Sequence, residues 1–249
     1  MNPHLLLKDQ SDIELPRMPG KVHIVEGDKL RIAQELVRRG VCQWIPLQEV
    51  YSVNGVKVLN GLFGVEKPKK LENGAPVFRC IMNLTGSNST QVQLEGGTDS
   101  LLSITSWQSL VIDEGEVIET FQSDMSSAFY LFRLPRVWLK YLSFNIVYDG
   151  VDIGLDTGEK MALACSVIPM GWHNSVGIMQ EISENLLKRT SISPFNQVVR
   201  GKSLPCWFSD ILTHSSEEDK FWWHIYLDNF CAGERLEPCS SATRADLCS

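Results

Sequence analysis

Residues 221–230 read FWWHIYLDNF, and we predict the fold outward from this stretch. Aromatic residues on both sides of Leu227-Asp228-Asn229 are typical of two β-strands joined by a tight turn. The turn would display the carboxylate of Asp228 at the tip of a hairpin. The stretch therefore predicts an antiparallel hairpin with an acidic side chain at its end.

A second carboxylate, Asp124, stands between a strand pattern at 117–123 and a short helical pattern at 126–134. Two carboxylates at strand ends suit divalent metals, because Mg²⁺ binds a few carboxylates together with substrate phosphates. A pair of such ions can stabilise both the attacking and the leaving oxygen in phosphoryl transfer. The structural alternative is that Asp124 caps a helix and Asp228 occupies a β-turn.

A third pattern, Ile168-Pro169-Met170-Gly171-Trp172, is a Gly-containing turn that leads into an amphipathic helix predicted over 174–189. Asp28 is the predicted N-cap of a helix that ends at Gly40. The other local predictions are hairpin turns at Asn54-Gly55 and Asn60-Gly61, strands at 77–84, 138–147 and 161–168, a helix at 107–111 and a loosely ordered lead-in at 1–28.

The composition indicates a globular protein, with 249 residues, 43% hydrophobic and 21% charged. It excludes collagen-like and disordered chains. No stretch approaches the roughly 20 apolar residues of a membrane span. The N-terminus does not resemble a secretory signal, and the seven cysteines include no C-x-x-C pair. We therefore expect free thiols in an intracellular protein of the cytoplasm or nucleus.

The net charge of −7 argues at first sight against nucleic-acid binding, which needs Lys and Arg to replace phosphate counterions. The charge is uneven, however. Residues 1–80 carry a net charge of +3 and residues 81–249 a net charge of −10. Part of the acidic excess belongs to the two carboxylates that would bind cations.

Taken in their order along the chain, these patterns resemble the reverse transcriptases of retroelements. Asp124 with Ala128 and Phe129 is similar to the family's first palm motif. Residues 168–175 are similar to the segment that opens the palm helix, and Tyr226-Leu227-Asp228-Asn229 is similar to the Tyr-x-Asp-Asp hairpin. Two upstream features are similar to the fingers: the stretch Phe78 to Leu84 followed by Asn88, and the basic residue Lys67. The resemblance covers roughly residues 40–235.

The resemblance implies an α+β fold, namely a reverse-transcriptase-like palm of antiparallel sheet backed by helices, with interleaved fingers and without a thumb. Residues 1–40 would form an N-terminal extension and leading helix, residues 41–117 the fingers, and residues 118–249 a truncated palm. The palm part would include a fingers hairpin near 146–165 and a long segment at 190–220.

The resemblance also implies roles for individual residues. Asp124 and Asp228, with the backbone carbonyl of Met125, would hold two Mg²⁺ ions, or Mn²⁺ in their place. Phe129 would lie under the sugar of the incoming nucleotide and exclude a ribose 2′-hydroxyl. The remaining roles are nucleotide contacts from Lys67, Arg79, Met170 and Gly171, and contacts near the primer end from Tyr226.

The implied activity is that of an RNA-directed DNA polymerase, a nucleotidyltransferase. Its substrates would be deoxynucleoside triphosphates and a primed RNA or DNA template, with no membrane partner. Further domains of a longer polyprotein are additional partners that the resemblance leaves open.

Some residues depart from the family pattern. Asn229 stands where the family hairpin has its second Asp, and Asn83-Leu84-Thr85 replaces Asp-x-Arg, which removes one basic contact. Asn229, together with the early end expected for the palm, favours an alternative, a catalytically weak or inactive remnant that binds nucleic acid or protein. An RNA-dependent RNA polymerase is a third possibility, although such enzymes normally have a polar residue at the position of Phe129.

Overall fold

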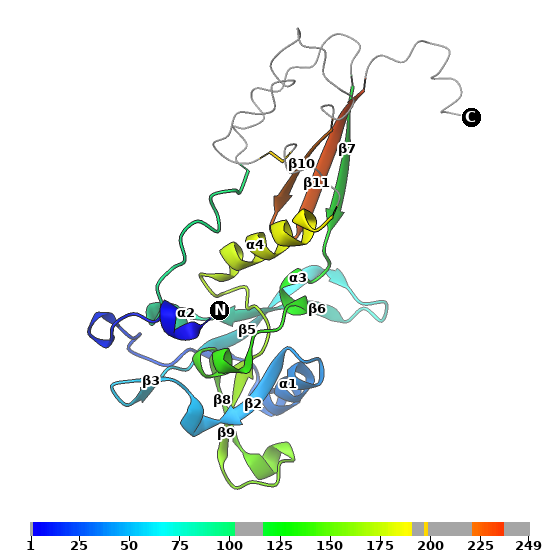
Figure 1. Ribbon diagram of the computed structural model, residues 1–249. Helices are drawn as coiled ribbons and strands as arrows, with labels where there is room; N and C mark the ends of the chain where they lie inside the picture. Colours follow the sequence, from blue (N-terminus) through cyan, green and yellow to red (C-terminus); the bar gives the residue numbers. More distant parts are fainter. Residues whose placement is uncertain (1, 103–116, 191–196, 199–220, 237–249) are drawn as a thin grey trace. The chain divides into compact units, whose positions relative to one another are not determined.

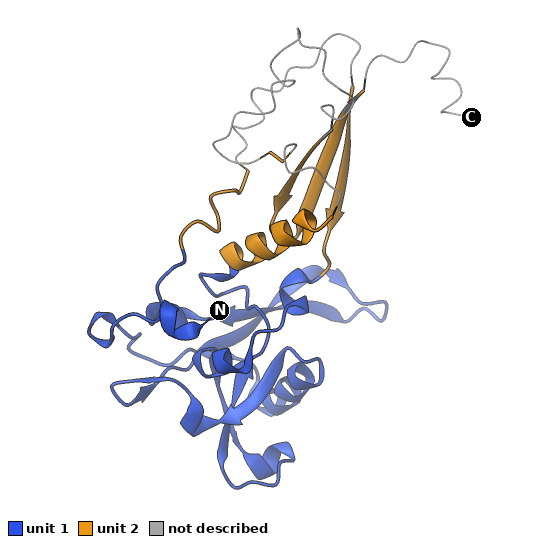
Figure 2. Ribbon diagram, in the orientation of Figure 1, with its two compact units in different colours: residues 1–94, 127–175 blue, residues 95–126, 176–249 orange. Residues whose placement is uncertain are grey.

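The computed structural model describes residues 2–102, 117–190, 197–198 and 221–236 (Figure 1). The chain is a mixed α+β protein with several small, mostly antiparallel sheets and few helices, as the sequence predicts. It divides into two compact units, each made of two chain segments (Figure 2). Unit 1 comprises residues 1–94 and 127–175, and unit 2 comprises residues 95–126 and 176–249. The palm and fingers boundaries stay predictions.

Unit 1 contains three small sheets. The first joins β1 (Val22–His23), β5 (Gly61–Lys70) and β6 (Pro76–Asn83), with β1 parallel and β6 antiparallel to β5. The second, wholly antiparallel, joins β2 (Cys42–Pro46), β9 (Lys160–Cys165) and β8 (Ser143–Asp149). The third is the hairpin of β3 (Ser52–Val53) and β4 (Val56–Lys57). Its turn residues Asn54 and Gly55 both have positive φ, which confirms the predicted hairpin turn.

The helical segments of unit 1 are short apart from one. They are α1 (Glu26–Arg38), α2 (Thr85–Ser89), α3 (Ala128–Leu131) and 3-10 turns at Pro3–Leu6, Gln10–Asp12, Leu47–Glu49, Arg136–Tyr141 and Gly150–Ile153. The core contains an aromatic cluster in which the ring of Trp138 lies 5.1 Å from that of Trp172 and 6.2 Å from that of Tyr141. All three rings are almost fully buried. In the described part of the chain, no helix is long and apolar enough to cross a membrane.

Unit 2 contains one antiparallel sheet in the order β10 (Phe221–Tyr226), β11 (Asn229–Leu236) and β7 (Val117–Asp124), together with α4 (Ser175–Lys188). Leu187 of α4 packs against a cluster of Trp223, Ile225 and Ala232 on this sheet. The predicted hairpin at 221–230, the strand at 117–123 and the helix at 174–189 are therefore confirmed.

The predicted turn at Asn60-Gly61 is wrong. Asn60 is fully buried, and its Nδ2 donates to Ser87 Oγ at 2.7 Å and to the Ser143 carbonyl at 2.8 Å. Gly61 begins β5, where a Cβ would lie only 2.5 Å from the carbonyl oxygen of Lys21. Asn60 forms buried hydrogen bonds, and Gly61 allows two segments of the chain to approach closely. Asn and Gly are also the residues typical of turns, so the sequence alone does not distinguish the two uses.

Other predictions need correction at their ends. Helix α1 has Val25 as N-cap, and Asp28 lies in its first turn, where it pairs with Arg31 at 3.0 Å. The predicted helix at 126–134 is only α3. The strand predicted at 138–147 begins at Ser143, because the chain after Pro135 forms a 3-10 turn. The lead-in is ordered in part, since Leu6 is buried. The predicted helix at 107–111, and residues 190–220 except 190 and 197–198, lie outside the described residues.

Candidate functional site

The sheet of unit 2 brings Asp124 next to the hairpin that carries Asp228. Asp124, the last residue of β7, is the cross-strand partner of Asn229, which in turn pairs with Tyr226 of β10. The backbone N–H of Met125 donates to the carbonyl of Asp228 at 3.1 Å. Two aspartates that are far apart in the sequence therefore lie at the same end of one small sheet.

Strand alternation determines which face of the sheet carries these groups. Tyr226, Asn229 and Asp124 form one row across the three strands. Side chains alternate between faces, so the next row points to the opposite side. That next row contains Ile225, which packs with Leu187 of α4. Asp124 therefore lies on the face that does not contact α4.

One more row shares the face of Asp124, two positions further along the strands: His224, Cys231 and Gln122. Burial lowers the pKa of His224 from its ordinary value. This face is therefore mainly polar near its acidic end, whereas on the opposite face Trp223, Ile225 and Ala232 pack with Leu187 of α4.

The hairpin turn consists of Leu227 and Asp228, and the buried amide of Gln180 in α4 holds it. The Leu227 N–H donates to Gln180 Oε1 at 2.9 Å, and Gln180 Nε2 donates to the Ile225 carbonyl at 3.2 Å. Leu227 has a φ of 58°, a left-handed conformation that costs a residue with a side chain about 1 kcal/mol. Since Gln180 is only 1% exposed, these bonds are shielded from water and fix the turn that carries Asp228.

Gln180 has two further contacts within unit 2. Its Nε2 lies 2.9 Å from Glu184 Oε1 on the next turn of α4 and 3.3 Å from Ser100 Oγ. Gly97, near Ser100, crosses α4 at Gly177, where a Cβ on Gly97 would lie 2.8 Å from the Gly177 Cα. The segment before the undescribed residues 103–116 is thus anchored on the same helix as the hairpin.

The oxygen atoms at the end of this sheet fit a hard cation. Asp124 is exposed and Asp228 is half-buried, and neither forms an ion pair with another described residue. The described residues include no group of three or more His, Cys, Asp or Glu side chains placed to hold a metal. Carboxylates suit Mg²⁺, an ion that completes its shell with water and substrate phosphates.

The other predicted site residues belong to unit 1. Lys67 lies on β5 and Arg79 on β6, and both are exposed. Phe129 is a half-buried residue of α3, and Met170 is 41% exposed just before Gly171. The predicted site residues therefore form two sets: the carboxylate set in unit 2 and the nucleotide-contact set in unit 1.

Gly171 joins two of the sequence motifs inside unit 1. A Cβ at Gly171 would lie 1.8 Å from the carbonyl oxygen of Met82 in β6, so no other residue fits without a shift of the backbone. Asn88 Nδ2 donates to the Gly171 carbonyl at 3.0 Å, and Asn88 Oδ1 accepts from the His173 N–H at 3.1 Å. The turn at 168–173 therefore packs against the end of β6 and the start of α2.

Two buried amides that the sequence analysis missed also hold this turn. Trp172 Nε1 donates to Gln91 Oε1 at 2.8 Å. Asn174 accepts from the Leu94 N–H at 2.8 Å and donates to the Val92 carbonyl at 3.1 Å. Residues 86–100 look like a polar loop in the sequence, and no local pattern marks Gln91 as buried.

Neither the models of known protein families nor the curated proteins compared with this chain give a match.

Proposed function

We propose that the chain is the fingers-and-palm part of an RNA-directed DNA polymerase of a retroelement. The observation that carries the proposal is the pairing of Asp124 with Asn229 beside Asp228, on the face of the sheet away from α4. A polymerase needs two carboxylates from distant parts of the chain at one accessible strand end. This arrangement supports the proposal independently of the motif resemblance.

In the proposed reaction, the primer 3′-hydroxyl attacks the α-phosphate of a deoxynucleoside triphosphate. A new P–O bond forms, the bond to the β-phosphate breaks, and pyrophosphate leaves. Lys67 and Arg79 would bind the triphosphate, and their charge would stabilise the negative charge that develops on the leaving group. Phe129 would exclude a ribose 2′-hydroxyl, while Met170 and Gly171 would line the nucleotide pocket and Tyr226 would lie near the primer end.

Asp124 and Asp228 would hold Mg²⁺ together with the carbonyl of Met125. When bound, Mg²⁺ supplies positive charge to the phosphate oxygens and favours the ionised primer hydroxyl. The hydrogen bonds of Gln180 to the Ile225 carbonyl and the Leu227 N–H would then hold the backbone of the Asp228 turn in the position that metal binding needs. A site held by a buried helix side chain is more precise than one on a free loop.

A second candidate function is a binding module without polymerase activity. It is favoured by Asn229, which places a neutral amide opposite Asp124 where the family resemblance expects a carboxylate. An amide oxygen is a weaker ligand for Mg²⁺ than a carboxylate. This candidate predicts nucleic-acid or protein binding that does not depend on a divalent metal.

Calorimetry with dTTP separates the two candidates. The polymerase predicts that Mg²⁺ or Mn²⁺ strengthens dTTP binding and that Asp124→Asn abolishes this effect. Asp156→Asn is the matched control, because Asp156 is an exposed residue of the β8–β9 connection in unit 1. dTTP affinity that does not depend on Mg²⁺ or Mn²⁺ would support the binding module, and equal metal dependence in all three proteins would contradict the role of Asp124.

A further inference from the structure

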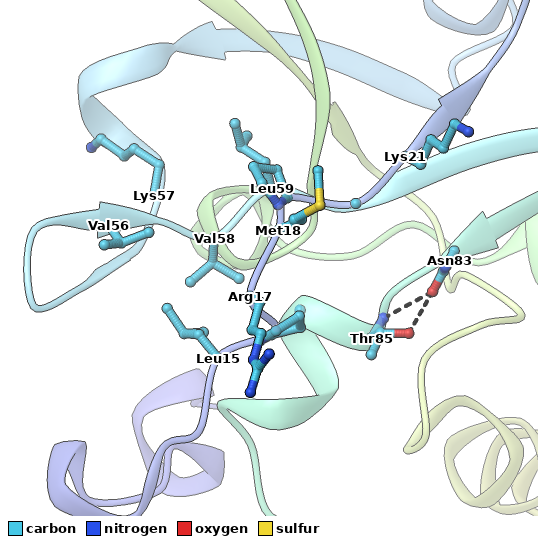
Figure 3. Close-up of a pocket in the computed structure, with 14 residues that line it drawn as sticks. Leu15, Arg17, Met18, Lys21, Val56, Lys57, Val58, Leu59, Asn83 and Thr85 are labelled. Atoms are coloured by element: carbon cyan, nitrogen blue, oxygen red, sulfur yellow. Dashed lines mark hydrogen bonds between the residues drawn. The ribbon is translucent and has the colours of Figure 1, made fainter.

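A cavity of about 270 Å³ in unit 1 has none of the predicted site residues in its lining (Figure 3). Three parts of the chain line it: the N-terminal segment 15–21, residues 56–59 at β4, and residues 83–86 between β6 and α2. The N-terminal wall is fixed in place, because the Gly20 N–H donates to the Leu59 carbonyl at 2.8 Å. A Cβ on Gly20 would lie 2.1 Å from the backbone nitrogen of Gly61, so the N-terminal segment is in direct contact with the start of β5.

The charged groups of the cavity are all cationic. Its lining includes Arg17, Lys21 and Lys57 and no acidic residue. Lys57 is already engaged, since its Nζ donates to the carbonyls of Gln48 at 2.9 Å and Val50 at 2.8 Å. Arg17 and Lys21 are exposed and form no ion pair with any described residue. Two unpaired cations on a chain of net charge −7 favour an anionic ligand.

The uncharged lining is apolar with a few polar groups. Met18 is 77% exposed and Val56 is 58% exposed at the cavity, and Val58 is buried in its wall. Asn83 and Thr85 supply an amide and a hydroxyl, and Asn83 Oδ1 accepts from Thr85 Oγ1 at 2.6 Å. Apolar surface beside hydrogen-bonding groups and cations fits a nucleotide, which has a base to stack and a phosphate to neutralise. An acyl chain would leave the polar groups unused.

We propose that this cavity binds a short stretch of a single-stranded nucleic acid, with separate phosphates on Arg17 and Lys21 and a base against Met18 and Val56. The inference rests on nucleic acid being the ligand class of the proposed function, but it does not need catalysis. The cavity would give unit 1 a contact with the nucleic acid that is separate from the contacts of Asp124 and Asp228.

The test measures the anisotropy of a labelled twelve-nucleotide oligo(dT) in EDTA, with the full chain carrying Asp124→Asn so that catalysis plays no part. The pocket variant is Arg17→Gln with Lys21→Gln. The control variant is Arg31→Gln with Arg38→Gln, which removes the same charge from exposed positions of α1. Circular dichroism establishes that each variant is folded.

Each phosphate contact to a single strand contributes about 0.7 to the slope of log K against log salt. The pocket variant should therefore lower that slope by about 1.4 and weaken binding roughly 25-fold at 0.1 M salt, whereas the control should stay within about threefold. Met18→Ser should weaken binding without changing the slope. AMP should compete with the oligonucleotide at lower concentrations than inorganic phosphate does.

Equal losses in the pocket and control variants would overturn the inference, because binding would then depend only on net charge. Vesicles of phosphatidylserine and phosphatidylcholine test a lipid surface as the source of the phosphate. Binding to these vesicles that needs Arg17 and Lys21, without oligonucleotide binding, would also overturn it. Since the assay contains no metal, its outcome is separate from that of the dTTP calorimetry.

Discussion

Replacing Gln180 by Ala tests whether α4 holds the turn that carries Asp228. The substitution removes the partner of the Leu227 N–H, at 2.9 Å, and of the Ile225 carbonyl, at 3.2 Å. Leaving a buried polar group without a partner costs about 1–3 kcal/mol. Ile225 is 5% exposed, but Leu227 is only partly buried, so water can replace part of what its N–H loses. We therefore expect the hairpin to lose about 2–4 kcal/mol of its opening free energy.

Hydrogen exchange followed by mass spectrometry measures this loss at the hairpin itself. A loss of 2–4 kcal/mol corresponds to roughly 30- to 900-fold faster exchange of peptides that cover 225–229. Asn185→Ala is the control on the same helix, because Asn185 is exposed and its amide donates to Glu181 Oε1, one helical turn away, at 2.8 Å. The control should change exchange by less than about threefold. If exchange in Gln180→Ala also stayed within threefold of the wild-type chain, the hydrogen bonds of Gln180 would not stabilise the hairpin, contrary to this prediction.

Three further predictions concern other parts of the molecule. Phe129→Ala should increase ribonucleotide incorporation in a primer-extension assay relative to deoxynucleotide incorporation, and an unchanged ratio would contradict the proposed role of Phe129 in excluding a ribose 2′-hydroxyl. Gly233→Ala should destabilise the chain by about 1–3 kcal/mol in urea denaturation, because the added Cβ would lie 2.1 Å from Cζ2 of the buried Trp222; a neutral effect would contradict this packing. Burial raises the pKa of the Cys80 thiol to about 11 and that of Cys165 to about 12, so these thiols ionise first in the unfolded chain. Stability in urea should therefore hold up to about pH 9 and fall above it, by as much as about 1.4 kcal/mol per pH unit for each thiol, and Cys165→Ala should reduce that slope.

The elements with strong periodic patterns could be predicted from the sequence. Helix α4 has a regular apolar stripe, and the hairpin of β10 and β11 has aromatic strands around a short turn. Both patterns report burial of one face, which is a local property of each segment. The pairing of Asp124 with the hairpin has no local signal in the sequence, because the register between distant strands depends on tertiary contacts, and only the family resemblance implies that Asp124 and Asp228 lie together.

The wrong predictions have a common physical origin. Asn60-Gly61 has the composition of a turn. In the structure, however, the Asn60 amide forms a buried hydrogen bond to Ser87, and the absence of a side chain on Gly61 allows the close approach of Lys21. No prediction concerned the burial of Gln180, because the sequence of an amphipathic helix gives no local sign that a glutamine is buried against a distant turn. Such residues are recognised only once the segments that they join are placed together.

The proposed polymerase activity is tested by one primer-extension measurement. Purified chain is mixed with a primed RNA template, dNTPs and Mg²⁺, and its extension rate is compared with those of Asp124→Asn and Asp228→Asn. The proposal predicts Mg²⁺-dependent extension by the wild-type chain and a loss of about 10³-fold in each variant, comparable with removal of a principal stabilising group. Extension that is equal in the wild-type chain and in Asp124→Asn would contradict the assignment of these carboxylates.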